Sequence, residues 1–128
     1  MRTTLKTPDV AQTDDFFSQG VRVGNTIYVS GMVAHDKDGN VVGKGDMTVQ
    51  ARQVIENMRI MLETAGATLD HVVKVTMFVT DMSLAPLARA VRMEYFTKNP
   101  PASTGIQVAA LIEPDLLIEM EAIAVIDD

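Results

Sequence analysis

The first strand-like pattern of apolar residues lies at residues 20–31 and predicts a β-hairpin. β-Branched and other apolar residues flank Gly24-Asn25, a pair that suits the tight two-residue turn of such a hairpin. A second turn is expected at residues 36–40, which carry acidic residues at the spacing that starts a calcium loop. The carboxylate that closes such a loop is absent at the required offset, and this favours a solvated turn.

Helical spacing then predicts a long helix at about residues 47–65. Asp46 or Thr48 can cap its start, and Gly66 can end it. The apolar residues recur at i, i+4, i+7, i+8 and i+11, as Val54, Met58, Met61, Leu62 and Ala65. A second helix is predicted at residues 86–96, because proline suits its first turn and the Asn-Pro-Pro run at residues 99–101 stops it.

Residues 71–80, between the two helices, alternate as a strand. The two faces are expected to carry Val73, Val75, Met77 and Val79 on one side, and Val72, Lys74, Thr76 and Phe78 on the other. Both faces are mostly apolar, so we expect a helix to cover one and another subunit to cover the other. Two final strands are predicted at residues 105–110 and 116–126, and an extra N-terminal strand is left open.

This order of elements predicts an α+β fold, formed by one domain over residues 1–128, with a mixed β-sheet and two helices on one face. A single domain has no further elements to cover the opposite face of the sheet. The pattern therefore indicates an oligomer.

Composition and charge narrow the classes of function. The chain has no cysteine, which excludes disulfides, thiolate catalysis and thiolate metal sites. It has no apolar run of signal-peptide or membrane-span length, so we expect a cytoplasmic protein without a membrane partner. A net charge of −6, from 17 acidic and 11 basic residues, disfavours nucleic acid as a partner. The two histidines, His35 and His71, lack metal-binding spacing, so no metal is expected.

The most unusual local feature is a pair of glutamates in the last predicted strand. Alternation places Glu119 and Glu121 on one face with Ile123 and Val125. Apolar surroundings raise the pKa of a carboxyl group and prepare it to transfer protons near neutral pH. The alternative is a solvated strand end whose carboxylates are structural, which is the commoner situation in proteins.

Short motifs along the chain resemble those of one protein family. Residues 17–25 are similar to its Y-x-Q-(A/G)-x-x-x-G-N motif, with Phe17 in place of the tyrosine. Further matches follow in the family's order: Tyr28-Val29-Ser30-Gly31, Ala65-Gly66-Ala67, the run from Val72 to Asp81, Pro101-Ala102, Val108-Ala109-Ala110-Leu111 and Ile118-Glu119-Met120-Glu121. Each motif is weak alone, but together they resemble the Rid/YjgF family of reactive-intermediate deaminases.

The resemblance implies a chorismate-mutase-like fold and a homotrimer with a central barrel, whose sites lie in clefts between subunits. It implies a hydrolase that converts reactive enamines and imines, such as 2-aminoacrylate, to oxo acids and ammonia without a cofactor. Glu119 matches the family's glutamate and is the expected catalytic residue, which positions water and transfers protons. Ser30 and the backbone near Gly31 are expected to line the cleft.

The sequence departs from the family where the substrate carboxylate is bound. Active members carry P-A-R-S, whereas this chain has Pro101-Ala102-Ser103-Thr104, so Ser103 stands in the place of the arginine. The loss of such a charge-assisted pair costs about 1.5–3 kcal/mol of binding. The family's asparagine and tyrosine on the second helix are replaced by Arg89 and Arg92.

These departures suggest that Arg89 supplies the missing cation from the helix. In the alternative, both arginines lie on a solvated helix face and pair with Glu94 or Asp81. The expected substrate-binding residues are Phe17, Ser30, Gly31, Arg89, Ser103 and Thr104.

The predicted function is hydrolytic deamination of a small enamine or imine acid. The substrate is either 2-aminoacrylate-like or a larger unsaturated amino acid such as aminomuconate. An alternative is a regulatory module that binds a small carboxylate or keto acid in the same cleft without turnover. Ribonuclease activity or translation inhibition is less favoured, because the chain is acidic and lacks a basic groove.

Overall fold

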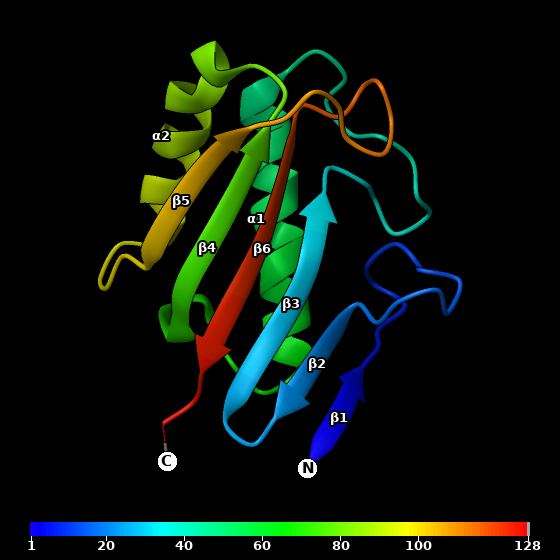
Figure 1. Cartoon of the computed structure of the whole chain (residues 1–128), viewed down its shortest axis with the longest axis vertical. Helices are drawn as coiled ribbons and strands as arrows, with labels where there is room; N and C mark the ends of the chain where they lie inside the picture. The colour runs from blue at the N-terminus through cyan, green and yellow to red at the C-terminus, as the bar shows by residue number, and fades with distance from the viewer. Residues whose placement is uncertain (128) are drawn as a thin grey trace.

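A computed structural model describes residues 1–127 of the chain. Its strands are β1 (Arg2–Leu5), β2 (Gly20–Val23), β3 (Thr26–Val33), β4 (Val72–Val79), β5 (Ala102–Gln107) and β6 (Ile118–Val125). Its helices are α1 (Met47–Thr64) and α2 (Ala85–Tyr95), with single 3₁₀ turns at η1 (Leu69–His71) and η2 (Met82–Leu84). The strands form one sheet in the order β1-β2-β3-β6-β4-β5 (Figure 1).

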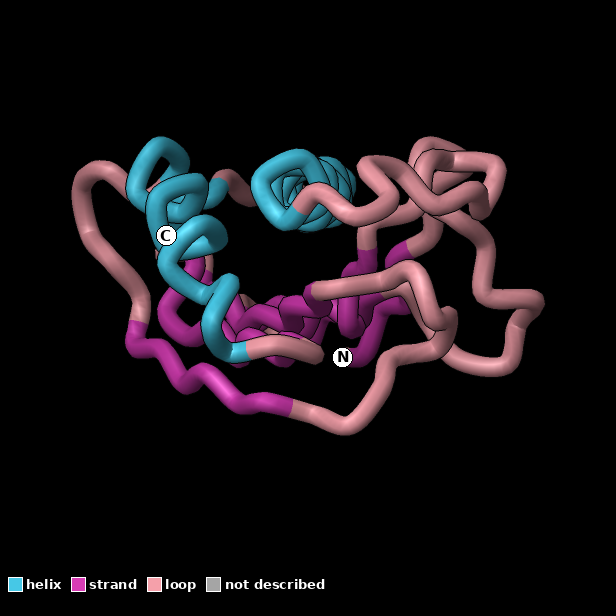
Figure 2. The backbone as a smooth tube through the Cα atoms, turned by 90° about the horizontal axis from the view of Figure 1, so that it is seen from above, coloured by secondary structure: helices cyan, strands magenta, loops and turns pink. Residues whose placement is uncertain are grey.

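The topology places both helices on the same face of the sheet. Strands β3 and β4 are both antiparallel to β6, and β4 is parallel to β5. Helix α1 therefore connects β3 to β4, and α2 connects β4 to β5, as two crossovers that advance in the same direction. Crossovers of the usual right-handed kind then lie on one face, as Figure 2 shows. The predicted mixed sheet with two helices on one face is confirmed.

Helix α1 forms the centre of the core. Its apolar stripe is fully buried, since Val54, Met58, Met61 and Leu62 each have 0% of their surface exposed. Asp46, not Thr48, caps the start of the helix, because its carboxylate accepts a hydrogen bond from the Val49 N–H at 3.1 Å. Gly66 follows the end with φ +82°, a conformation that glycine adopts without strain. The predicted helix is thus confirmed to within one residue.

Two strand predictions were wrong in detail. The register of β4 against β6 shifts between Val72 and Lys74, so Val72 is buried and Val73 is 47% exposed. Strand β5 runs from Ala102 to Gln107 and not from residue 105 to 110. Its bounds follow from its partner, because parallel pairing begins opposite Lys74 and ends where β4 ends at Val79. Residues 103 and 104 therefore lie within the strand.

The face of the sheet opposite the helices carries apolar side chains. Tyr28, paired with Ile123, is 48% exposed, and Ile106, paired with Phe78, is 41% exposed. All six residues of the edge strand β5 are exposed. These exposed apolar residues agree with the expectation of an oligomer, and the trimer with its central barrel stays a prediction.

Candidate active site

A β-bulge in β3 forms the floor of the candidate site. Val29 pairs with Ala122 and Met32 with Met120, so Ser30 and Gly31 both lie opposite the single residue Glu121. Such a bulge bends the strand and changes the direction of its side chains. The Ser30 N–H donates to the Gln19 carbonyl at 3.0 Å, and its hydroxyl donates to the Ser18 carbonyl. The bulge is therefore held by the segment that precedes β2.

The carboxylate of Glu119 lies directly over this bulge. A Cβ atom on Gly31 would be 2.8 Å from Cδ of Glu119 and closer still to its Oε2. Glycine is therefore needed at position 31 because the carboxylate occupies the space of a side chain. Glu119 is half-buried, and burial raises the pKa of its carboxyl group, with a smaller contribution from the negative charge of Glu121. The predicted common face of the two glutamates is confirmed by the burial pattern of β6.

A cavity of about 640 Å³ opens beside Glu119. Four residues predicted from the sequence line it together, namely Phe17, Ser30, Gly31 and Glu119. Among the described residues that line the cavity there is no Lys or Arg, while Asp14, Glu119 and Glu121 contribute carboxylates. The described lining of the cavity therefore offers carboxylates and polar backbone groups, but no Lys or Arg side chain to bind an acid.

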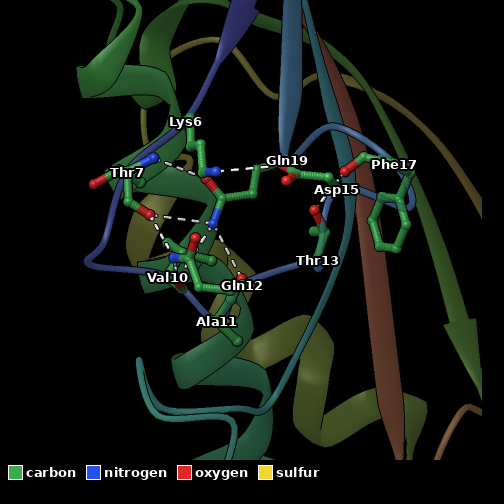
Figure 3. Close-up of polar contacts among 9 residues, drawn as sticks. All are labelled: Lys6, Thr7, Val10, Ala11, Gln12, Thr13, Asp15, Phe17 and Gln19. Carbon is green, nitrogen blue, oxygen red and sulfur yellow. Dashed lines mark hydrogen bonds and ion pairs between the residues drawn. The ribbon is translucent and has the colours of Figure 1, made fainter.

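The N-terminal wall of the cavity is held by the buried side chain of Gln19. Its Oε1 accepts from the Thr7 N–H at 2.8 Å. Its Nε2 donates to the carbonyls of Ala11, Thr7 and Val10 at 3.0, 3.2 and 3.3 Å. Figure 3 shows this amide among the loop residues that it binds, with Phe17 beyond Asp15 and Thr13. The sequence marked Gln19 only as part of a motif and did not indicate this role.

Two buried polar residues of α1 hold the loop before β6 and the end of β3. Gln50 donates from Nε2 to the Asp115 carbonyl and accepts from the Leu117 N–H, both at 2.8 Å. Asn57 donates from Nδ2 to the carbonyls of Val33 and His35, at 3.0 and 2.9 Å. Sequence analysis missed these roles, although an amide within an otherwise buried helical stripe is a signal for such contacts.

His35 lies at the cavity wall and contacts Glu113 from the loop before β6. Its Nε2 is 2.6 Å from Oε1 of Glu113. His71 is elsewhere, where its Nδ1 accepts from the Thr68 N–H at 3.0 Å. Within residues 1–127, no group of His, Asp or Glu side chains could hold a metal ion.

The remaining predicted residues, Arg89, Ser103 and Thr104, do not line this cavity. Ser103 on β5 accepts a hydrogen bond from Nη1 of Arg92 on α2 at 2.9 Å. Arg92 is half-buried, and burial lowers the pKa of its guanidinium group. Thr104 accepts from Nζ of Lys74 at 2.8 Å. Arg89 is exposed, and its side chain has no hydrogen bond to any residue of the described part of the chain.

The alternative in which the two arginines pair with Glu94 or Asp81 is not what the structure shows. Glu94 forms an ion pair with Arg52 at 3.1 Å. Asp81 caps η2 by accepting from the Ser83 N–H at 3.0 Å. Arg92 instead contacts Ser103, the residue that stands in the place of the family's arginine.

The two groups of predicted residues do not meet within one chain. Ser103 pairs with Val75, which in turn pairs with Ala122, so the three side chains lie on the same face of the sheet. The side chains of Val75 and Ala122 are buried beneath the helices. Glu119 is three residues further along β6 and lies on the opposite face of the sheet. Arg92 therefore cannot enter the cavity of its own chain beside Glu119.

The sequence profile of the family described as Endoribonuclease L-PSP matches residues 8–126, which is nearly the whole chain. The chain belongs to the Rid/YjgF family. A RutC family protein of Pyrococcus abyssi is 43% identical over 108 residues, and the match covers 84% of each chain.

Solved structures of Rid/YjgF relatives have the same fold. One is a protein of unknown function of the Rid family, YyfA from Yersinia pestis, with a TM-score of 0.93 and 29% identity over 98% of this chain and 100% of that one. Another is TdcF of E. coli with bound serine, with a TM-score of 0.89 and 26% identity over 98% of this chain and 99% of that one.

The Rid/YjgF chain has no helix, within its described residues, that is long and apolar enough to cross a membrane. Its departures from the family pattern are local. They lie in the N-terminal loop at Phe17 and at the contact between α2 and β5, where Arg92 and Ser103 meet.

Proposed function

We propose that this Rid/YjgF protein hydrolyses small reactive enamine or imine acids to oxo acids and ammonia. The observation that carries the proposal is the half-buried carboxyl group of Glu119, whose pKa is raised by burial in a cavity large enough for a small molecule. A carboxyl group with a pKa nearer to neutral can both accept and donate protons in one reaction cycle. The substrate class includes 2-aminoacrylate-like acids and larger unsaturated amino acids such as aminomuconate.

Hydrolysis of the imine needs two proton relays through Glu119 and no other reactant than water. An enamine first becomes an imine by gaining a proton at carbon and losing one from nitrogen. Glu119 then accepts a proton from water while the water oxygen bonds to the imine carbon, and the C=N π electrons move to nitrogen, which takes the proton. In the second step the hydroxyl loses its proton to Glu119, which passes it to the nitrogen. The O–H bonding electrons then form the C=O bond, the C–N bond breaks, and ammonia leaves with the bonding pair. The oxo acid remains, and no cofactor enters the balance.

The other cavity residues have supporting roles in this proposal. The bulge at Ser30 and Gly31 presents polar backbone groups next to the carboxylate of Glu119. Phe17, which is 52% exposed, forms part of an apolar wall that reduces contact between the reacting atoms and bulk water. The bound serine of TdcF supports a ligand of amino-acid size.

The proposal includes the homotrimer with a central barrel that the family resemblance implies. The exposed apolar residues on the helix-free face support it, since such a face is usually covered by another subunit. Light scattering in solution tests this part. A particle of one chain mass at micromolar concentration would contradict it.

A coupled assay tests the reaction. An amino-acid oxidase generates imines in the cuvette, while ammonia and oxo acid formation are followed with and without the protein. We expect acceleration by the wild type and a loss of about a hundredfold in Glu119→Gln, which keeps the shape but cannot accept a proton. Equal rates with and without the wild-type protein, across several imines, would contradict the proposal.

A non-catalytic binding module is the second candidate, and one observation favours it. The described residues lining the cavity include no Lys or Arg, and the position of the family's arginine is Ser103. Binding of an oxo acid without ammonia release would select this candidate. The endoribonuclease description of the family is less favoured for this chain, because its net charge is −6 and its cavity carries three carboxylates.

A further inference from the structure

The guanidinium group of Arg92 is an incompletely satisfied charge. It is half-buried, which lowers its pKa, yet its single hydrogen bond within residues 1–127 goes to the neutral hydroxyl of Ser103 at 2.9 Å. A guanidinium has five N–H donors, and a charge removed from water is normally paired. The arginines of α1 follow that rule, since Arg52 pairs with Glu94 and Arg59 pairs with Glu56. Arg92 is therefore placed to receive an anion.

We propose that Arg92 and Ser103 bind the carboxylate of the substrate that Glu119 of a neighbouring copy hydrolyses. This inference rests on the proposed function and names its carboxylate-binding residues. The lining of the Glu119 cavity includes no Lys or Arg among its described residues, whereas Arg92 lacks an acid. The two lie on opposite faces of the sheet in one chain, so only a second copy can bring them together. The exposed edge strand β5 is the surface that presents Arg92 and Ser103 to that copy.

Ser103 takes part as a donor as well as an acceptor. Its oxygen accepts an N–H from Arg92, and in the described residues its own hydroxyl proton has no acceptor. That proton and the free N–H groups of Arg92 can all be donated to one carboxylate. The cation thus comes from α2, where Arg92 contacts Ser103 of β5, and not from a side chain of the strand itself. The small side chain of serine at position 103 leaves space for the guanidinium group.

Two other cations are nearby, and the structure makes each a poorer anchor. Nζ of Lys74 already has two acceptors, Thr104 Oγ1 at 2.8 Å and the Val75 carbonyl at 3.3 Å. Arg89 is exposed, so an anion bound there would remain hydrated and its pairing would be weak. Both residues serve as comparisons in the test, because each variant removes one positive charge without changing Arg92. Arg89 lies on α2 with Arg92, whereas Lys74 lies on the opposite face of the sheet from Ser103.

The first test separates binding from chemistry in the imine assay. Arg92→Ala is expected to raise KM about ten- to a hundredfold while kcat changes little, because a charged hydrogen-bonded contact to the carboxylate is lost. Arg92→Lys should recover only part of the loss, since lysine lacks the planar fork. With an imine whose carboxylate is replaced by a neutral amide, Arg92→Ala should change KM little. An equal or larger KM increase in Arg89→Ala or Lys74→Met would overturn the proposal.

The second test asks which copy supplies each residue. Glu119→Gln chains and Arg92→Ala chains, each weakly active alone, are co-expressed with different tags and the mixed oligomers are purified. In random mixing about a quarter of the interfaces pair an intact Glu119 with an intact Arg92 of the neighbour. We expect that fraction of sites to show the wild-type KM. Mixed oligomers with only the summed activity of the two parents would overturn the shared site.

Binding of pyruvate, an oxo acid, by calorimetry distinguishes failure of the inference from failure of the proposed function. Unchanged affinity in Arg92→Ala overturns Arg92 as the carboxylate anchor, whatever the imine assay gives. A tenfold or greater loss of affinity, in a protein whose wild type does not accelerate imine hydrolysis, retains the anchor and removes the catalytic proposal.

Discussion

The two regions that carry the candidate site residues differ in how completely their own chain holds them. Around Glu119, the buried amides of Gln19 and Asn57 hold the N-terminal loop and the end of β3, which line the cavity, and Gln50 holds the loop before β6. Around Ser103, the edge strand β5 is exposed along its whole length and is bonded to the sheet on one side only. The proposed proton-transfer group is thus held within one chain, while the proposed anion-binding group lies at a surface.

The two regions differ because their proposed roles need different surroundings. A catalytic carboxylate needs fixed geometry and partial burial, and both come from rigid elements with satisfied polar contacts. A flat exposed edge strand with apolar neighbours tends to be covered by another chain. The chain therefore builds one half of the candidate site in its own core and presents the other half where a second copy can reach it.

The largest effect is expected from adding a methyl group at the bulge. In Gly31→Ala the new Cβ would overlap the carboxyl group of Glu119, with only 2.8 Å to its Cδ. The carboxylate must shift from its position over the bulge, and we expect a loss of about a hundredfold or more in imine hydrolysis, which the coupled assay measures.

A glycine-to-alanine substitution in β5 is the control for Gly31→Ala. In Gly105→Ala the added Cβ would meet only Cε of Met77 at 3.7 Å, which is an ordinary contact. We expect Gly105→Ala to keep the melting temperature and most of the activity. If the two variants lost equal activity, the cavity would not be the more tightly built of the two regions.

Removal of the buried amide at position 19 should cost stability as well as activity. Gln19→Leu leaves the Thr7 N–H and the Ala11 carbonyl without this partner and removes one of two donors from the Thr7 and Val10 carbonyls, at a cost of about 2–3 kcal/mol in the free energy of unfolding. Urea denaturation measures the change. Gln12→Leu is the matched control, because Gln12 donates to the Thr7 and Val10 carbonyls from an exposed position, where water can replace it. A loss as large in Gln12→Leu would mean that the loop is not held from the core side.

The sequence predicted the parts of the fold that depend on local periodicity. The stripe of α1 and the alternation of β6 are set by spacing within one element, and both are confirmed. The bulges of β3 and β4 depend on the register of a partner strand, which no pattern within the strand reveals. The start of β5 likewise follows from its pairing with β4, so the prediction was three residues late.

The candidate site was predictable only where a motif marked it. Residues 17, 30, 31 and 119 line one cavity, and the family resemblance had implied part of this grouping. Gln50 bonds to Asp115 and Leu117, which lie 65 and 67 positions further along the chain. The spacing of residues within one helix cannot indicate such distant contacts. The choice between Arg89 and Arg92 depends on the rotation of α2 against β5, and the structure gives the contact with Ser103 to Arg92.

Glu119→Gln is expected to make the protein slightly more stable, whereas the preceding substitutions lower activity or stability. The pKa of Glu119 is raised in the folded state above its ordinary value of 4.5, so folding favours the protonated form. Its stabilising contribution is complete below about pH 4.5 and is lost as pH rises through the raised pKa. Glu119→Gln should therefore melt at a higher temperature than the wild type at pH 7–8 and at the same temperature near pH 4. Because water screens a half-exposed group, the gain should stay below about 1 kcal/mol. A lower melting temperature at pH 8 would show that the carboxylate is stabilised by contacts and is not strained by burial.

The smallest effect concerns the neighbour of the catalytic carboxyl group. Glu121 is the second cause of the raised pKa of Glu119, after burial. Glu121→Gln removes its negative charge, so the pKa of Glu119 should fall while burial keeps it above the ordinary value. If Glu119 acts as a base, as proposed, kcat/KM should then begin to decline at a lower pH than in the wild type, by less than about one unit. Glu63→Gln, at the far end of α1, removes the same charge without changing the surroundings of Glu119 and should leave the profile in place. A shift to higher pH in Glu121→Gln would mean that Glu121 stabilises the charged form of its neighbour, and the acidic character of the cavity would then not account for the raised pKa.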